Sequence, residues 1–234
     1  MGALMIFSGN KSGYLWGTFG MAVLFLMVSC AAKYQTKDRN PIEPESGAMR
    51  TTPVSNLSFL DLLSMRKPVR VFRPEQIAED ELQTVIKAAS ASPVGLGMFD
   101  NYRLTIVQNR KIHEKINRAT SRAFNNNPMM DDALHGAPTL IIISAIPNPN
   151  TEMPGLEIAT SACIADTMLF AATGLGLGSC YICSFVEGIN FDPSLLKELK
   201  IMDGYKPIAG VILGYPVEPL SPRETASLIE YDRL

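Results

Sequence analysis

The chain has 234 residues, of which 47% are hydrophobic, and it carries a formal net charge of −2. That length and apolar content suit one globular domain with a sizeable core. The slightly acidic balance provides no basic face that could neutralise a nucleic-acid backbone, which excludes nucleic acid as a partner. Four cysteines do not make a disulfide framework in a chain this long, and the two histidines, His113 and His135, argue against a metal site.

The first thirty residues differ from the rest. A single lysine, Lys11, precedes an uncharged apolar run from Tyr14 to Val28, which is shorter than the roughly 20 residues of a spanning helix and fits a signal peptide. The run ends in "LMVSC", which resembles the lipobox of bacterial lipoproteins, where the cysteine is lipidated and becomes the mature N-terminus. Residues 1–30 are therefore predicted to be a lipoprotein-type signal, with lipid on Cys30 and the mature protein membrane-associated in the cell envelope.

An uncleaved membrane anchor is the alternative for residues 1–30. By the positive-inside tendency, the excess of basic residues after the apolar run would keep the rest of the chain on the cytoplasmic side of the inner membrane. Residues 31–54 are polar and proline-bearing without apolar periodicity, so we predict a flexible tether there. The folded domain is expected over residues 55–234.

Helical and strand patterns alternate after the tether. Apolar residues at helical spacing predict helices over 57–63, 82–89 and 112–119. "YRLTIVQ" alternates like a half-buried strand, whereas the apolar runs "PTLIIISA" and "PIAGVILGY" suit strands that are covered on both faces.

The stretch from Ile158 to Ala172 predicts a helix with small or apolar residues on nearly every side. Such a helix should be buried all round, which a domain of this size rarely achieves alone. The pattern therefore favours a homodimer interface. A central helix packed under the sheet of a monomer is the alternative.

The sequence "GLGLGSCYICS", residues 174–184, combines closely spaced glycines with two cysteines. A dinucleotide-binding loop needs its glycines before the N-terminus of a helix, but these follow a helix, and Tyr181 breaks the GxGxxG pattern. We predict a helix C-cap and tight turn instead. Cys180 and Cys183 would point to opposite faces of a strand and are too few for zinc, so they are interpreted as small buried hydrophobic residues.

Basic residues occur near both ends of the expected domain. "MRKPVRVF" contains Arg66, Lys67 and Arg70, and the proline-rich segment "GYPVEPLSPRE" contains Arg223. Guanidinium groups bind phosphate oxygens in a bidentate manner, so these side chains could converge on one phosphate. Solvated surface charges are the alternative.

From residue 55 to 223 the sequence resembles the FMN-dependent nitroreductase family. The resemblance rests on ordered motifs: "SMRKPVRVF", "ASASPVGLGMFDNYRLTIV", "HGAPTLIIIS", "ACIADTMLFAATGLGLGSCYI" and "GYKPIAGVILGYP". It implies a homodimeric α+β fold, with a central mixed β-sheet flanked by helices and FMN held between intertwined subunits. The implied cofactor-binding residues are Arg66, Lys67, Pro68, Arg70, Ser92, Pro93, Val94, Gly95, Tyr181, Ile182, Cys183, Ser184 and Arg223.

The chain departs from the family pattern at two positions. Pro68 replaces the usual serine, and the segment Gly97–Tyr102 lacks the Asn-x-Gln-Pro-Trp motif that many members carry in the flavin loop. Asn101 is the candidate for the missing amide contact. These departures affect substrate choice more than flavin binding.

The activity implied by the resemblance is hydride transfer from a reduced donor through flavin N5 to a nitroaromatic, quinone or related acceptor, with no side chain acting as acid or base. NAD(P)H is the expected donor if the domain is cytoplasmic, and another donor is required if it is exported. The loop after residue 121 is a candidate substrate cover, with Phe124 as a stacking group. The alternatives are a membrane-tethered flavin protein that carries electrons without turnover, and a flavin-free ligand-binding lipoprotein.

Overall fold

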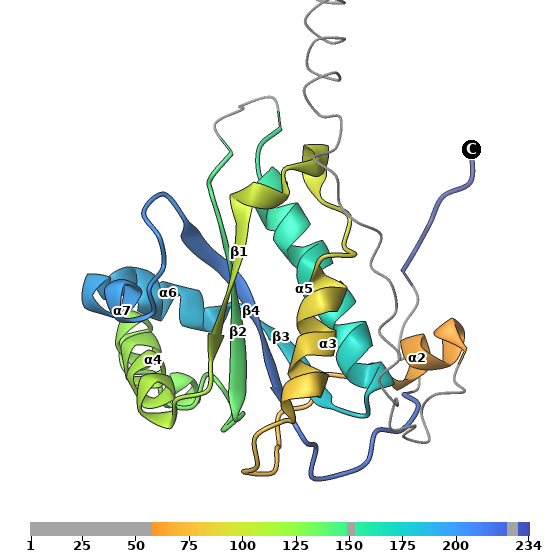
Figure 1. Ribbon diagram of the computed structural model, residues 1–234, viewed down its shortest axis with the longest axis horizontal. Helices are drawn as coiled ribbons and strands as arrows, with labels where there is room; N and C mark the ends of the chain where they lie inside the picture. Colours follow the sequence, from red (N-terminus) through yellow and green to blue (C-terminus); the bar gives the residue numbers. More distant parts are fainter. Residues whose placement is uncertain (1–57, 149–152, 224–228) are drawn as a thin grey trace, which may run out of the picture. The chain divides into compact units, whose positions relative to one another are not determined.

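The computed structural model describes residues 58–148, 153–223 and 229–234, all of which belong to the unit from Arg50 to Leu234. The predicted signal or anchor, the tether and Cys30 lie outside the described residues. A four-stranded sheet with the order β1-β2-β4-β3 has helices on both faces (Figure 1). Its strands are β1 (Tyr102–Val107), β2 (Thr139–Ala145), β3 (Gly178–Ile182) and β4 (Lys206–Gly214).

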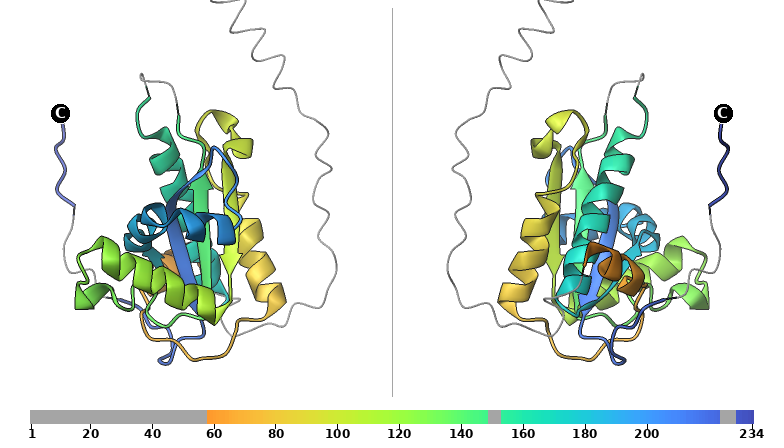
Figure 2. Two further views of the ribbon diagram at one scale, coloured as in Figure 1. Left: turned by 90° about the vertical axis from the view of Figure 1, so that its left-hand side faces the viewer. Right: turned by 90° about the vertical axis from the view of Figure 1, so that its right-hand side faces the viewer.

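The helices form two layers, one on each side of the sheet (Figures 1 and 2). One side carries α2 (Phe59–Met65), α3 (Glu79–Ala89) and α5 (Leu156–Gly174), and the other carries α4 (Arg110–Ala123), α6 (Ser184–Phe191) and α7 (Pro193–Glu198). Three short 3₁₀ helices, η2 (Gly95–Gly97), η3 (Phe99–Asn101) and η4 (Pro128–Met130), lie in the connecting segments. The α+β fold class expected from the sequence is confirmed.

The two inner strands form the centre of the core, as their apolar runs predict. Every residue of β2 is buried, and alternate residues serve opposite faces of the sheet. Ile141 and Ile143 pack with α3 and α5, whereas Leu140 and Ile142 pack with α4 and α6. Burial on both faces explains why the strand is continuously apolar rather than alternating.

All strand pairings in the sheet are antiparallel. The parallel component of the expected mixed sheet is limited, in the part of the chain that the structure describes, to an isolated bridge between Pro68 and Ser179 at the outer edge of β3. This bridge brings the segment after α2 to the sheet.

The predicted C-cap after α5 is confirmed as a Schellman motif. The Leu177 N–H donates to the Ala172 carbonyl at 2.9 Å, and the Gly176 N–H donates to the Thr173 carbonyl at 3.0 Å. Gly176 has φ +74°, a conformation in which glycine carries no side-chain penalty. The turn reverses the chain into β3.

A single chain does not bury α5 all round, so the alternative of a central helix wholly packed within a monomer is wrong, and burial in a homodimer stays a prediction. One side of the helix packs on the sheet, but Ile158, Ala159, Ala162, Cys163 and Asp166 are exposed. Within the described residues, α5 is also the one helix that is long and apolar enough to cross a membrane, although 44% of its apolar window is buried inside the domain.

Gly188 sets the approach of α6 to α4. A Cβ at this position would lie 2.4 Å from the Thr120 backbone nitrogen and 2.6 Å from its Cα. We therefore expect Gly188→Ala to lower the free energy of unfolding by about 1–3 kcal/mol, because rigid helix backbones must separate to admit the methyl group. Chemical denaturation measures this loss.

Gly174→Ala is the matched control, because a Cβ there meets only the Leu62 Cδ2 at 3.9 Å, an ordinary contact. Alanine at this helical position should leave stability unchanged or raise it by about 0.5–1 kcal/mol. Equal destabilisation by both substitutions would contradict the close crossing of α4 and α6.

Candidate functional site

The segment after α2 runs along the free edge of β3. The Val69 N–H donates to the Ser179 carbonyl at 2.9 Å, next to the bridge at Pro68. Gly178 permits this approach, because a Cβ there would lie 2.8 Å from the Val69 Cγ1. The pairing therefore places Lys67 and Arg70, which flank it, beside β3.

The C-terminal segment returns along the same stretch of chain. The Arg73 N–H donates to the Tyr215 carbonyl at 2.8 Å, and Phe72 and Pro216 form an antiparallel bridge. A pocket of about 240 Å³ lies between residues 67–71 and residues 216–218. Two segments that are about 150 residues apart in sequence are thus paired through their backbones.

Arg223 lies where this return ends. Its N–H donates to the Ser64 carbonyl at 2.9 Å, in the last turn of α2 and two residues before Arg66. The Lys67 Nζ donates to the Ser221 Oγ at 3.1 Å, which fixes the ammonium against the same segment. The structure therefore brings together the two segments that carry these basic residues, and convergence of their side chains on one phosphate stays a prediction.

The electrostatic environment of Cys180 shows that Arg66 and Arg70 are also close to β3. Burial raises the pKa of the Cys180 thiol, and the positive charges of Arg70 and Arg66 oppose that rise. Arg70 also lies near His135, whose pKa is lowered by burial and further by the Arg70 charge. Both effects require the guanidinium groups to lie close to these side chains.

These basic residues have no carboxylate partners within the described residues. The two ion pairs there join Arg110 to Glu114 and Lys115 to Glu198, on the opposite side of the domain. Glu218 lines the same pocket as Lys67 and Arg70 without forming an ion pair with them. Because several cations gather against this single carboxylate, the group is suited to binding an anion. We call Arg66, Lys67, Arg70 and Arg223 the cationic cluster.

The end of β3 lies next to the cationic cluster. Tyr181 is exposed, Ile182 is buried, and Cys183 is exposed at the N-cap of α6, whose first residue is Ser184. Cys180 and Cys183 point to different environments, as predicted, although Cys183 is not buried. Burial and the neighbouring Cys183 raise the pKa of Tyr181.

The predicted site residues 92–95 lie elsewhere, at the N-terminal end of α5 (Figure 2). The Gly95 N–H donates to the Thr160 Oγ1 at 3.2 Å, and a Cβ on Gly95 would lie 2.4 Å from the Leu156 Cδ1. The cationic cluster lies at the other end of α5, where α2 packs through the Phe59 and Phe170 rings. One chain does not bring the two groups of predicted site residues together.

Buried polar atoms without a hydrogen-bond partner concentrate near residues 92–95. Among the described residues there are four such side-chain atoms, and three of them, Ser92 Oγ, Glu157 Oε2 and Ser161 Oγ, lie on this loop or on the first turns of α5. A buried polar group without a partner is costly, so this end of α5 is suited to receiving additional hydrogen-bonding groups.

Phe124 forms the C-cap of α4 and is partly exposed, followed by Asn125 and Asn126 with positive φ. The same loop ends at His135, beside Arg70. The position of His135 near the cationic cluster is not predictable from the sequence, which carries no local signal for it. Within residues 58–148, 153–223 and 229–234, no three His, Cys, Asp or Glu residues come together as metal ligands.

Comparisons with known proteins identify similar sequences and folds. A curated protein from Methanothermobacter thermautotrophicus, named provisionally as an NADH dehydrogenase/NAD(P)H nitroreductase, is 24% identical over 77% of this chain and 87% of its own length. A nitroreductase with bound FMN from Bacteroides fragilis is 25% identical, with a TM-score of 0.56 over 79% of this chain and 95% of its own.

A nitroreductase with bound FMN from Desulfitobacterium hafniense has a similar fold, with a TM-score of 0.64 and 21% identity over 74% of this chain and 97% of its own. The model of the nitroreductase family matches residues 63–215. That match spans both the segment of Lys67 and Arg70 and the whole sheet, and the chain therefore belongs to the nitroreductase family.

Proposed function

We propose that this protein is an FMN-dependent oxidoreductase that works as a homodimer and transfers electrons from a reduced donor to a small conjugated acceptor. The observation that carries the proposal is the cationic cluster, which two distant chain segments assemble beside an edge strand. The nitroreductase family assignment supplies the class of chemistry. Named NAD(P)H nitroreductases among the relatives make NAD(P)H the proposed donor for a domain that faces the cytoplasm, whereas a lipidated and exported domain needs another reduced donor.

The cationic cluster fits the phosphate of FMN. A phosphate monoester carries a charge between −1 and −2 at neutral pH, and arginine forks bind its oxygens bidentately. Arg70 and Arg223 are both exposed, so their guanidinium groups are accessible to a ligand. We assign these two arginines to the phosphate, and Arg66 to the adjoining ribityl chain.

The exposed end of β3 fits the planar ring of the cofactor. Beyond the bridge at Ser179, the outer edge of the strand continues through Tyr181 to Cys183 without further pairing in the described residues. Unpaired backbone N–H groups at such an edge donate to ligand atoms as they would to a further strand. We assign Lys67, whose Nζ donates to the Ser221 Oγ, to the stabilisation of negative charge on the ring.

FMN, when bound, supplies two-electron transfer between donor and acceptor. The residues of this chain hold and orient the cofactor and balance its charge. No acid or base residue is assigned, because none of the groups in the cluster is placed for proton transfer. A nitroaromatic or a quinone is the proposed acceptor class, and Phe124 is proposed to stack on it.

The exposed face of α5 provides the dimer contact. Ile158 is 56% exposed, and Ala159, Ala162 and Cys163 continue a largely apolar face along the helix. Phe59 and Leu60 of α2, both largely exposed, extend this surface at the far end of α5. A contiguous apolar face of this kind is typical of a subunit interface.

Antiparallel packing of two α5 helices across a two-fold axis would also complete the cofactor site. The helix has 19 residues and is therefore roughly 28 Å long. Two-fold packing places the N-terminal end of one α5 beside the C-terminal end of the other. Residues 92–95 of one chain would then lie next to the cationic cluster of its partner, which explains their separation within one chain.

The phosphate assignment is tested with the double variant Arg70→Ala/Arg223→Ala. We expect about 100-fold weaker FMN binding or more, because each charge-assisted contact to phosphate contributes on the order of 1.5–3 kcal/mol. The protein should stay folded and dimeric. Flavin absorbance after gel filtration and NAD(P)H oxidation with a nitroaromatic or quinone acceptor measure the two losses.

The control is Lys111→Ala/Arg118→Ala, which removes the same charge from exposed positions of α4. It should retain flavin and turnover. Undiminished FMN in the Arg70/Arg223 variant would refute the phosphate assignment. Native protein that binds FMN but never turns over with any donor would instead favour the electron-carrier function, and a colourless native protein that does not take up FMN would refute both.

The dimer is tested with Ala162→Glu. A carboxylate in the middle of the exposed α5 face would be buried without a partner, so we expect dimer dissociation to be favoured about 100-fold or more. Light scattering should give the mass of one chain, with parallel loss of bound FMN. Thr84→Glu on the exposed side of α3 should leave the dimer intact, and a dimeric Ala162→Glu protein with full flavin would contradict this interface.

We propose that Cys30 is lipidated and that the domain is tethered to the membrane. The support is the sequence "LMVSC" after an apolar run. Mass spectrometry of membrane-extracted protein should find a diacylglyceryl-modified cysteine at the N-terminus, and Cys30→Ser should leave the full-length precursor. An intact Met1 in the native protein would favour the anchor with a cytoplasmic domain, and hence NAD(P)H as donor.

A further inference from the structure

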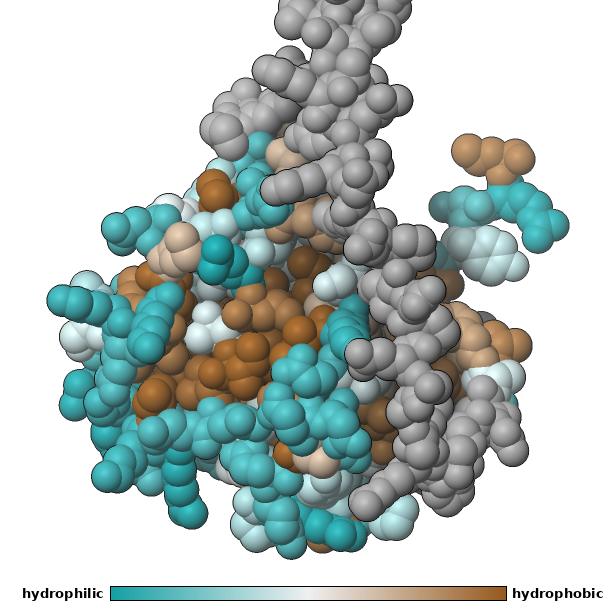
Figure 3. Space-filling model, in the orientation of Figure 1, coloured by the Kyte–Doolittle hydropathy of each residue, from teal (hydrophilic) through white to brown (hydrophobic). Residues whose placement is uncertain are grey.

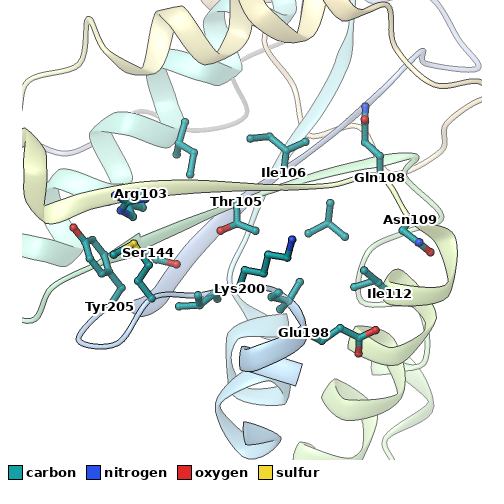
Figure 4. Close-up of a pocket in the computed structure, with 15 residues that line it drawn as sticks. Arg103, Thr105, Ile106, Gln108, Asn109, Ile112, Ser144, Glu198, Lys200 and Tyr205 are labelled. Carbon is teal, nitrogen blue, oxygen red and sulfur yellow. The ribbon is translucent and has the colours of Figure 1, made fainter. Parts of the chain in front are cut away.

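A second pocket, of about 400 Å³, lies at the opposite edge of the sheet from the cationic cluster. Its floor is the edge strand β1 with the neighbouring end of β2, and its far wall is the segment that follows α7 (Figure 4). β1 and β3 are the two outer strands of the four-stranded sheet, so three strand spacings, roughly 14 Å, separate this pocket from the proposed cofactor site.

Ser144 lines this pocket with an unsatisfied hydroxyl. The residue is 1% exposed, and its Oγ has no hydrogen-bond partner in the part of the chain that the structure describes. It lies opposite Arg103 in the antiparallel ladder, immediately after a register irregularity at Ile143. Bulges of this kind redirect side chains and are over-represented near functional sites.

Lys200 brings a positive charge over the same pocket. It follows α7 with φ +54°, a conformation that is unfavourable for lysine and normally taken by glycine or asparagine. In Figure 4 its side chain extends across the pocket toward β1, on the side where Thr105 projects from the strand. No carboxylate pairs with the Lys200 ammonium among residues 58–148, 153–223 and 229–234.

Arg103 adds a second cation at the end of the pocket. Its guanidinium lies over the Tyr205 ring, 5.6 Å from the centroid, and it makes no ion pair in the described chain. The one carboxylate of the lining, Glu198, is already neutralised by the Lys115 ammonium at 2.7 Å. The pocket therefore has a net positive lining with donor groups still available.

The remainder of the pocket is apolar. Figure 3 shows hydrophobic surface gathered over β1 and bordered by hydrophilic side chains. The apolar lining residues include Ile112, Leu199, Ile201 and Met202. A ligand that fits must present a negative group to the polar and cationic side chains of the lining and a compact hydrophobic body to the rest.

We propose that this pocket binds a small organic carboxylate with a compact apolar body. The Lys200 ammonium and the Ser144 hydroxyl donate to the carboxylate oxygens, Arg103 contributes long-range attraction, and the aliphatic side chains cover the body of the ligand. A monoanionic carboxylate fits better than a free phosphate, because only one lysine reaches over the pocket and half of the wall cannot donate hydrogen bonds. The site is separate from the proposed flavin site and needs no flavin chemistry.

The probe is cyclohexanecarboxylate, titrated calorimetrically into the full-length, FMN-loaded protein in detergent. With nine non-hydrogen atoms, such a ligand should bind with a dissociation constant on the order of 1 mM. Lys200→Asn suits the left-handed backbone while removing the charge, and should weaken binding about tenfold or more. The neutral analogue cyclohexanecarboxamide should bind at least tenfold more weakly than the carboxylate.

Ser144→Ala gives a second, independent readout. Without the carboxylate, we expect its unfolding midpoint to rise by about 2–4 °C, because a buried hydroxyl without a partner is removed. With the carboxylate, affinity should fall about three- to tenfold. The control Lys197→Asn changes an exposed lysine of α7, the helix before Lys200, and should leave binding unchanged. None of these variants should change bound flavin.

Several outcomes would overturn the proposal. The first two are an unchanged affinity of the Lys200→Asn protein for cyclohexanecarboxylate, and equal binding of this acid and its amide. The third is loss of carboxylate binding in Arg70→Ala rather than in Lys200→Asn. The fourth is Lys200-dependent binding of inorganic phosphate without binding of the carboxylate. A lower unfolding midpoint for Ser144→Ala would show that the hydroxyl is already satisfied, and would equally count against the site.

Discussion

The backbone pairing of residues 67–72 with β3 on one side and with the C-terminal segment on the other is the contact on which the site depends. Arginine and lysine side chains repel each other, so backbone contacts must hold them together when they come from the two ends of a domain. Here the hydrogen bond from Val69 to Ser179, the bridge between Phe72 and Pro216, and the hydrogen bond from Arg223 to Ser64 supply that force. The absence of a side chain at Gly178 is what allows the first of these contacts.

The same organisation explains why the site residues fall into two groups. A helix as long as α5 holds its two ends far apart, and each end carries a different part of the candidate site. The C-terminal end lies by the cationic cluster, and the N-terminal end carries buried polar atoms without partners, including Ser92 and Ser161. Both features are unfavourable in one isolated chain. Two-fold packing, as proposed, would offset both at once, because it brings complementary ends together.

The sequence predicts the elements whose signals are local. The continuous apolar runs of β2 and β4 predict strands covered on both faces, and the position of Gly176 after a helical pattern predicts the cap that closes α5. The gathering of Arg66, Lys67 and Arg223 was also predictable, but through the family resemblance and not through periodicity. Local pattern carries no information about which distant segments pair.

The failures of prediction have the same physical origin. The helix of residues 158–172 has small residues on all sides, and hydrophobicity alone cannot distinguish burial by the chain itself from burial by a second subunit. His135 reaches Arg70 only because a loop with left-handed residues returns the chain to the sheet. The pocket at β1 was not predicted, because Ser144 lies within an apolar strand and Lys200 follows a short helix. No sequence pattern around either residue indicates a binding site.

Unfavourable features of this domain are concentrated at its sites and absent from most of its core. Elsewhere in the described chain the buried polar side chains are satisfied. The Thr120 and Thr173 hydroxyls donate to carbonyls one turn earlier in their helices, and the buried His113 ring bonds the Val107 carbonyl. Unpaired charges and unsatisfied hydroxyls therefore do not reflect loose packing in general. Among the described residues, the buried side-chain atoms without a partner occur at the N-terminal end of α5 and at the β1 pocket, where a ligand or a partner chain can supply the missing groups. Because nearly all other buried polar side chains of the described chain have partners, we interpret the unpartnered ones as groups whose cost in folding free energy is offset by binding.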